Sequence, residues 1–529
     1  MNEVNMIGIE NHFPKIQLKD DYTLQSILFG HRIKKDQTLY EYMIEFLQVM
    51  ISEKIVEDIR ERTFNEYFPV FEDIEKCQLK FSPISRVGLK RFVFYPESKI
   101  DSKFKIDDEA YFECKEQLKN KIKIEIDERY DQDDILKIIQ KLFYGISAVT
   151  KNRSWFAMSL LPVCKEVILP ESMGKKSKRK KIKKDEDLFK YYIDMENAFE
   201  YHNYNFMARG GEVYYLHVLR GILLSSKEVK EKIEKGFDNL INSFWQFSEL
   251  SNFIYNNWLE RYQELLKNSL DRSFFDDELE YNKKIKKSLG TIPINYDRRS
   301  KYTIIELENF LSSNIHTFEK MKILAYGIVL HIIRLMHEQV GILYNGKVNP
   351  WIIDMCSNSN VGNEMKKIAI ENFNDLENRF LEVINKYADE ERYEKSKKQI
   401  IKEASDNSYK LIRKLGKEIG LIIPINGPGM RMSLSEELLK FLVMSLIKPG
   451  KMLRIDSFLD KLYEHYRIII DRNTYKKAIN EGLLKDISDL SMFDANKKRF
   501  IEVLKECGFV RDLSDATSIV ENPYDEELI

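Results

Sequence analysis

Apolar residues recur at helical spacing along most of the chain, and this pattern predicts a mainly α-helical protein. Thr38 followed by Glu41 has the form of a capping box and marks the start of one helix. The most apolar long run, Ile323 to Met336, contains His331 and Arg334 and is shorter than the about 20 apolar residues that span a bilayer. We expect it to be a core helix. Further helical runs are expected from residue 133, over 229–270, over 303–340 and over 364–415. Residues 271–302 are charged and poorly periodic, so they are expected to form a connector.

Three short segments instead alternate apolar and polar residues, at 79–81, 91–95 and 122–126. Alternation over this length is typical of a half-buried strand. A small β element is therefore expected within the N-terminal part of an otherwise helical chain.

The stretch from Leu434 to Pro523 has the clearest order of elements. An amphipathic helix over 436–447 ends at Lys448-Pro449-Gly450, and a short strand-like piece follows over 452–455. Asp456 is expected to cap a second helix. After a spacer, a third helix is expected over 496–507, and it ends at Gly508, where a left-handed residue is favoured.

After Gly508 the apolar period changes from 3.6 to 2, and residues 509–513 and 517–520 are expected to pair as a hairpin around a turn at 514–516. Helix, strand, helix, helix and hairpin in this order resemble the winged helix-turn-helix class. The resemblance covers only about the last 90 residues. It implies a recognition module for DNA or for another protein.

With 529 residues the chain is long enough for two to four domains. The expected fold class is mainly α, with a multi-domain helical body, a small β element in the N-terminal region and a winged-helix-like C-terminal domain. The expected divisions are an N-terminal region with α and β elements at 1–170, a basic mobile loop at 171–187, a helical core domain at 188–420 and the C-terminal domain at 430–529.

Charge and cysteine content narrow the class of protein. The 84 Lys and Arg residues nearly cancel the 85 Asp and Glu residues, so any affinity for DNA must come from local clusters of charge. Five well-separated cysteines indicate reduced thiols, since a secreted disulfide framework is denser and even in number. The first residues lack the sustained apolar core of a signal peptide. A cytoplasmic protein without a membrane segment is therefore expected.

Basic residues cluster in one loop and in the C-terminal region. The run from Lys175 to Lys184 has eight basic residues in ten positions, which is typical of a phosphate-backbone contact, with a solvated linker and a nuclear-import signal as alternatives. The acidic residues of the hairpin, Asp512 and Asp515, make protein docking an equal alternative for the C-terminal domain. The residues expected to bind nucleic acid are Lys175, Lys176, Lys178, Arg179, Lys180, Lys181, Lys183, Lys184, Arg472, Lys476, Lys477, Lys497, Lys498, Arg499 and Arg511.

Arg209, Gly210 and Gly211 form a possible anion-binding site. Two glycines at the start of an aromatic helix can present backbone N–H groups to a phosphate or carboxylate, with Arg209 beside them. The alternative is that the glycines let two helices approach closely, with Glu212 already facing the helix dipole. A P-loop nucleotide site is not expected, because Gly-x4-Gly-Lys-Ser/Thr does not occur in the sequence.

A metal-dependent nuclease is the enzymatic alternative. Restriction-type nucleases use an acidic residue together with Glu-x-Lys, and the matching residues here are Glu97, Lys99, Asp107, Glu113 and Lys115. Such triplets arise by chance in a sequence rich in Glu and Lys, so we expect no catalytic residues.

Zinc ligands and cofactor motifs are not expected either, because no cysteines or histidines have Cys-x2-Cys or His-x3-His spacing. Arg334 and His337 lie one helical turn apart, a loose match to the Arg–His pairs of helical ribonucleases. A packed histidine is the more economical interpretation.

These features together predict a cytoplasmic, non-catalytic scaffold or accessory subunit that works on DNA with other protein subunits, for example in a prokaryotic DNA restriction or anti-phage defence system. A pure protein–protein adaptor is the remaining alternative. The two hypotheses differ in whether the protein binds DNA at low salt.

Overall fold

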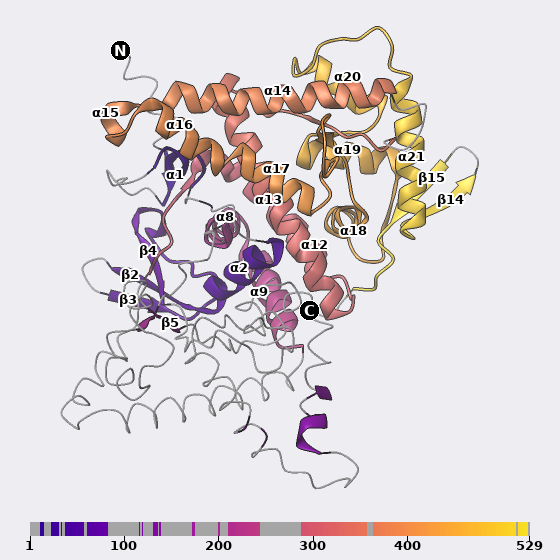
Figure 1. Cartoon of the computed structure of the whole chain (residues 1–529). Helices are drawn as coiled ribbons and strands as arrows, with labels where there is room; N and C mark the ends of the chain where they lie inside the picture. Colours follow the sequence, from indigo (N-terminus) through magenta and orange to yellow (C-terminus); the bar gives the residue numbers. More distant parts are fainter. Residues whose placement is uncertain are drawn as a thin grey trace, which may run out of the picture. The chain divides into compact units, whose positions relative to one another are not determined.

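Helices dominate the part of the chain that the computed structural model describes (Figure 1). This part has 14 α-helices and several small sheets, which confirms the expected mainly helical fold. The described residues are 11–14, 23–30, 33, 38–57, 61–82, 210–243, 287–356, 363–514 and 517–526, with short pieces at 116, 119, 131–135, 137–138, 172–174 and 199–201.

The chain divides into two compact units. The first contains residues 1–81, 207–238 and 288–529, and the second contains 82–206 and 239–287. In the second unit, β5 (Ser172–Gly174) pairs antiparallel with β6 (Phe199–Tyr201). The predicted strands at 91–95 and 122–126 lie outside the described residues. The domain limits expected along the sequence stay a prediction.

The N-terminal half of the described chain contributes short strands and four helices. The predicted strand at 79–81 is confirmed as β4, which belongs to a four-stranded sheet with the order β3-β2-β4-β7. The elements are β1 (His12–Phe13), α1 (Leu24–Phe29), α2 (Leu39–Ile51), β2 (Glu53–Glu57), β3 (Glu61–Phe64), β4 (Leu79–Ser82), α8 (Gly210–Leu223), α9 (Lys227–Ile241), β7 (Lys287–Ser288) and β8 (Ile292–Pro293).

The rest of the chain consists mainly of helices, with short strands between them and a β-hairpin at its end. After α12 (Asp297–Leu311) and α13 (Thr317–Asn345), β9 (Trp351–Ile352) leads to a series of helices seen along the top of Figure 1. The elements that follow are α14 (Asn363–Tyr387), α15 (Glu390–Tyr393), α16 (Lys397–Asp406), α17 (Tyr409–Glu418), β10 (Ile422–Ile423), β11 (Arg431–Met432), α18 (Glu436–Leu446), β12 (Met452–Arg454), α19 (Ile455–Tyr466), β13 (Ile468–Ile469), α20 (Arg472–Asn480), α21 (Met492–Glu506), β14 (Val510–Ser514) and β15 (Thr517–Glu521).

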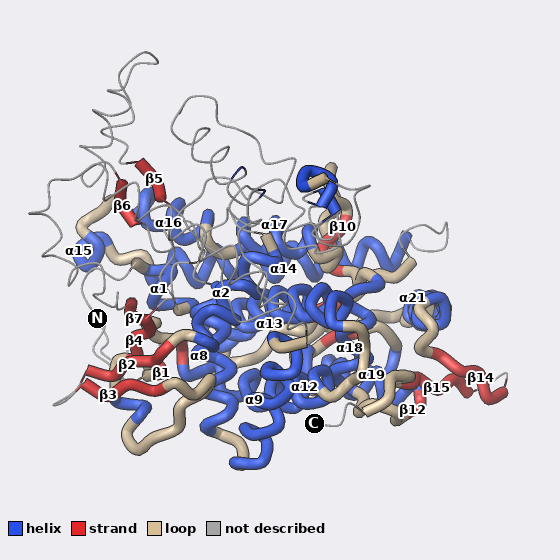
Figure 2. Tube along the Cα trace, turned by 90° about the horizontal axis from the view of Figure 1, so that it is seen from below, coloured by secondary structure: helices blue, strands red, loops and turns tan. Residues whose placement is uncertain are grey.

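Helix α13 lies at the centre of the first unit and contacts α2, α8, α14, α17 and α18 (Figure 2). It is the one described helix that is long and apolar enough to cross a membrane, but 94% of its most apolar stretch is buried inside the protein. Gly327 of α13 faces Phe441 of α18 so closely that a Cβ on Gly327 would lie 2.2 Å from the ring. The core helix expected over 323–336 is the middle of α13.

The C-terminal elements include the expected helix, strand, helix, helix and hairpin as α18, β12, α19, α21 and β14–β15, with β13 and α20 between α19 and α21. Strands β14 and β15 pair antiparallel, and β12 pairs with the other edge of β15, so the sheet order is β12-β15-β14. Gly508 has φ +81° where α21 ends, as its position predicts. The predicted hairpin is therefore confirmed.

Buried asparagine side chains attach these C-terminal elements to the rest of the first unit. The amide of Asn496 on α21 donates to the carbonyls of Ile353 and Ile470, both at 2.9 Å, and its oxygen accepts from the N–H of Met355 at 2.8 Å. Asn522 donates to the hydroxyl of Ser313, just after α12, at 3.2 Å, and to the carbonyl of Ile447 at 2.9 Å. Each asparagine side chain thus supplies hydrogen bonds to backbone groups that have no partner within their own irregular segments.

Some local predictions were wrong. Asp456 does not cap α19, because the helix begins at Ile455 with Arg454 at the N-cap position. The predicted spacer before residue 496 contains β13 and α20, and α21 already begins at Met492. Residues 364–415 form four helices where one long stretch was expected, and Ile400 of α16 is buried. Packing at this position overrides the strongly charged local composition.

Candidate functional site

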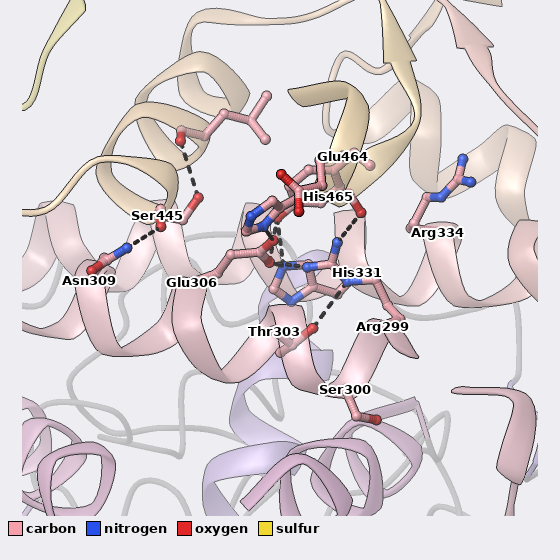
Figure 3. Close-up of polar contacts among 12 residues, drawn as sticks. Arg299, Ser300, Thr303, Glu306, Asn309, His331, Arg334, Ser445, Glu464 and His465 are labelled. Carbon is pink, nitrogen blue, oxygen red and sulfur yellow. Dashed lines mark hydrogen bonds and ion pairs between the residues drawn. The ribbon is translucent and has the colours of Figure 1, made fainter. Parts of the chain in front are cut away.

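A group of buried polar side chains surrounds Glu306 on α12 (Figure 3). Arg299, Thr303 and Glu306 lie at positions i, i+4 and i+7 of this helix, so they share one face. All three are 0% exposed. We call the Glu306 cluster the set formed by Tyr214 and His217 of α8, Arg299, Ser300, Thr303 and Glu306 of α12, His331 of α13, and His465 and Tyr466 of α19.

Four side chains donate hydrogen bonds to the Glu306 carboxylate. Its Oε2 atom receives the Tyr466 hydroxyl at 2.7 Å and the guanidinium of Arg299. Nε2 of His331 lies 2.9 Å from this oxygen and also 2.9 Å from the Tyr466 hydroxyl. The Oε1 atom of Glu306 is 2.7 Å from Nδ1 of His465. A buried carboxylate is costly unless its charge and lone pairs are satisfied, and here both conditions are met.

The two histidines that complete the interior of the cluster bridge neighbouring helices. Nδ1 of His331 lies 2.9 Å from the Tyr214 hydroxyl of α8. His217 of α8 contacts two hydroxyls of α12, with Nδ1 2.8 Å from Ser300 and Nε2 2.9 Å from Thr303. The cluster therefore joins four helices through hydrogen bonds that have specific partners.

Burial controls the protonation of these groups. Burial alone would raise the pKa of the Glu306 carboxyl, but Arg299 and the hydrogen bonds from the histidines outweigh it and hold the pKa well below the ordinary value. Burial lowers the pKa of His331. Burial also lowers the pKa of His217, to well below its ordinary value, and the nearby His331 and Arg299 add to this shift. At neutral pH Glu306 is thus charged, and His217 and His331 are neutral.

Two arginines of α12 also hold the last turn of α19. Arg298 donates to the carbonyl of Glu464 at 2.8 Å, and Arg299 donates to the carbonyl of His465 at 2.5 Å. The Tyr302 hydroxyl reaches the Glu464 carboxylate at 3.3 Å. The last carbonyls of a helix lack intrahelical partners and carry its negative dipole end, so arginine is favoured there.

A second pair of charges lies on α13 next to the cluster. Arg334 donates to Glu338 at 3.0 Å and to the carbonyl of Asn349 at 2.9 Å, and burial lowers its pKa to about 10. His337 accepts the indole N–H of Trp351 at 3.1 Å and is 3% exposed. Arg334 and His337 therefore both serve packing, and the loose ribonuclease match gains no support.

The Glu306 cluster is built for structure more than for chemistry on a substrate. His465, with 7% exposure, is the member nearest to solvent, and the interior members are fully buried. No group of three or more His, Cys, Asp or Glu side chains suited to a metal ion occurs in the part of the chain that the structure describes. Sequence reasoning missed the cluster because it treated 271–302 as a connector, although the spacing of Arg299, Thr303 and Glu306 was a readable signal.

The predicted nucleic-acid residues of the C-terminal region lie on α20, α21 and β14, and most of them form ion pairs. Lys476 and Lys498 are exposed and form no ion pair within the described residues. The pairs are Arg472 with Asp494, Lys477 with Asp460, Lys497 with Asp456, Arg499 with Glu502 and Glu506, and Arg511 with Glu521. This face is close to charge-balanced.

Gly210 and Gly211 lie at the N-terminus of α8, where the helix was expected to begin. The N–H of Gly211 donates to the Glu45 carboxylate of α2 at 2.7 Å. A Cβ on Gly211 would lie 2.4 Å from the backbone nitrogen of Phe46. The glycines thus allow close packing of α2 on α8, and the chain's own carboxylate already uses an amide that a bound anion would need.

Other predicted site residues lie outside the described residues: Arg209, the basic run (Lys175, Lys176, Lys178, Arg179, Lys180, Lys181, Lys183 and Lys184) and the nuclease set (Glu97, Lys99, Asp107, Glu113 and Lys115). Their roles stay predictions. Comparison of the chain with models of protein families, with curated proteins and with solved structures finds no match.

Proposed function

We propose that this protein is a non-catalytic accessory subunit of an assembly that acts on DNA, and that its C-terminal region is a winged-helix-like recognition module. The observation that supports the proposal is the sheet order β12-β15-β14, in which β12 lies between α18 and α19 and the β14–β15 hairpin follows α21. In winged helices a first short strand pairs with the last strand of the hairpin, and the helices before the hairpin present the recognition surface.

In this proposal DNA is held mainly through phosphate contacts. Among the C-terminal residues predicted to bind DNA, Lys476 of α20 and Lys498 of α21 are exposed and form no ion pair within the described residues. The basic run 175–184 would add contacts of the same kind. Each phosphate neutralised steepens the dependence of log Kd on log salt by about 0.9. The two lysines should therefore account for a change of about 2 in that slope.

A salt titration tests this function. Binding of a labelled duplex is measured by fluorescence anisotropy from about 50 to 300 mM salt for the full chain, a Lys476→Ala/Lys498→Ala variant and a variant lacking 175–184. We expect tight binding at low salt and a flatter slope in both variants. Lys398→Ala/Lys402→Ala provides the matched control, since both lysines are exposed on α16 and unpaired within the described residues. Absence of binding at 50 mM salt would contradict the proposal.

A protein–protein adaptor is the second candidate, and the ion pairs of α20 and α21 favour it. Five of the seven predicted basic side chains of the C-terminal region already face carboxylates, so the surface offers little net attraction for a polyanion. Such balanced, paired charges suit a polar protein interface. A stable complex with a co-expressed neighbouring gene product, lost in Lys476→Glu/Lys498→Glu, together with no DNA binding, would establish this alternative.

The nuclease alternative concerns residues outside the described part of the chain. Incubating the full-length protein with plasmid DNA and Mg²⁺ or Mn²⁺ tests it directly. Cleavage that is lost in Glu113→Ala would replace the accessory-subunit proposal by a metal-dependent nuclease.

A further inference from the structure

The hydrogen bonds of the Glu306 cluster are complete only while its interior histidines are neutral. Nε2 of His331 lies 2.9 Å from both the Glu306 carboxylate and the Tyr466 hydroxyl. When Nε2 donates to either oxygen in the neutral ring, Nδ1 must accept the hydrogen bond from the Tyr214 hydroxyl, 2.9 Å away. A second proton on His331 would turn Nδ1 into a donor and reverse this bond. The Tyr214 O–H would then need a new acceptor, and no other partner of this hydroxyl is seen among the described residues.

A proton on His331 would also create a charge without a counter-charge. The groups that face His331 are Arg299 and Glu306 of α12, Tyr466 and His465 of α19, and Tyr214 of α8, while α18 contributes only the ring of Phe441. Arg299 already neutralises Glu306, and on α13 itself Arg334 is paired with Glu338. An extra positive charge in a fully buried site therefore requires either deprotonation or access to water.

Water can enter with the smallest disruption at the C-terminal end of α19. His465 is the cluster member nearest to solvent, and the last turn of α19 is held there by Arg298, Arg299 and Tyr302 rather than by apolar packing alone. By contrast, Tyr463 and Ile469 on either side belong to an apolar cluster with Met365 of α14. Opening should thus remain local to the end of α19 and the start of β13.

We propose that the Glu306 cluster is a proton-sensitive latch. When one of its interior histidines takes up a proton, the last turn of α19 opens, and the connection from α19 through β13 to α20 loses its fixed geometry. A decrease to mildly acidic pH would therefore change the position of the C-terminal elements. The latch does not depend on whether those elements bind DNA or protein.

Hydrogen–deuterium exchange on the full chain tests the latch. Protection of amides 464–468 is measured between pH 8 and 5, corrected for the intrinsic exchange rate, with amides 439–446 of α18 as an internal reference. We expect protection at 464–468 to fall about tenfold for each unit by which the pH is lowered once one proton is linked to opening. The reference amides should change much less over the same range.

His331→Gln and His217→Gln, which cannot carry the extra proton, should each flatten this pH dependence. His316→Asn is the matched control, because His316 is exposed at the N-cap of α13 and accepts the N–H of Phe318, a role that asparagine can fill. An unchanged slope in both glutamine variants would overturn the latch, as would parallel loss of protection in α18. Should the variants fail to fold, NMR titration of the wild-type histidines decides: an interior ring that titrates near pH 6.5 with no change in amide protection also overturns it.

Discussion

Replacing Glu306 by glutamine perturbs the cluster at its only interior acid while keeping the shape of the side chain. In Glu306→Gln the guanidinium of Arg299 remains 0% exposed but loses its carboxylate. The amide oxygen can accept from some of the four donors, whereas the amide NH₂ must face donors such as His465. The variant therefore leaves a buried unpaired charge as well as unsatisfied hydrogen bonds.

The expected loss is large. Removing one partner of a buried ion pair costs about 3–5 kcal/mol. Exposed pairs contribute about 0–1 kcal/mol. Glu231→Gln is the matched control, since Glu231 pairs with Lys227 four residues earlier and the two side chains are 62% and 88% exposed.

Urea unfolding at pH 7.5, followed by far-UV circular dichroism, measures both variants against the natural sequence. We expect a large decrease in the midpoint for Glu306→Gln and almost none for Glu231→Gln. Adding Arg299→Met to Glu306→Gln should recover part of the loss, because the unpaired charge is then removed. A loss below about 1 kcal/mol for Glu306→Gln, with an unchanged urea dependence, would refute the assignment of Glu306 as the essential counter-charge.

Other expected outcomes concern pH and packing. Burial lowers the pKa of His217 and His331, and the hydrogen-bond donors around Glu306 lower the pKa of its carboxyl, so the folded state binds fewer protons than the unfolded state. The free energy of unfolding should therefore fall as the pH drops below about 6.5 and again below about 4.5. A urea midpoint that stays constant from pH 8 to 4 would contradict this. Gly211→Ala should destabilise the protein by about 1–3 kcal/mol, because the added Cβ clashes with α2. Helix propensity alone predicts the opposite, a gain in stability of about 1 kcal/mol. The sign of the change in thermal midpoint therefore distinguishes the two effects. Asn496→Ala should lower the free energy of unfolding, measured by urea titration, by about 3 kcal/mol, because two carbonyls and one N–H lose their hydrogen-bond partner. A loss below about 1 kcal/mol would mean that water replaces the amide.

Local signals read from the sequence were accurate where an element is defined by its own residues. The amphipathic run 436–447, the glycine at 508 and the change to alternation after it predicted α18, the end of α21 and the β14–β15 hairpin. Helical periodicity and chain-breaking residues act within a few positions, so one segment carries enough information. Helix α20 was missed because its apolar face is short.

The packing of those elements on one another could not be obtained in the same way. Arg298 and Arg299 were expected to lie in a charged connector, and only the fold places them at the carbonyl end of α19, more than 160 residues away in sequence. The predicted basic residues of α20 and α21 lost much of their meaning for DNA once Asp456, Asp460 and Asp494 were found opposite them. Ion pairing depends on distance in space, which residue type and local spacing do not encode.

The sequence by itself determined that this chain is mainly helical, that its apolar runs build a large core, and that it ends in a hairpin. Only the tertiary structure decided that the paired glycines serve helix contact, and that one buried carboxylate collects donors from three helices. The physical reason is range: hydrogen-bond periodicity is local to an element, whereas satisfying a buried charge requires partners that the folded chain brings together from distant positions.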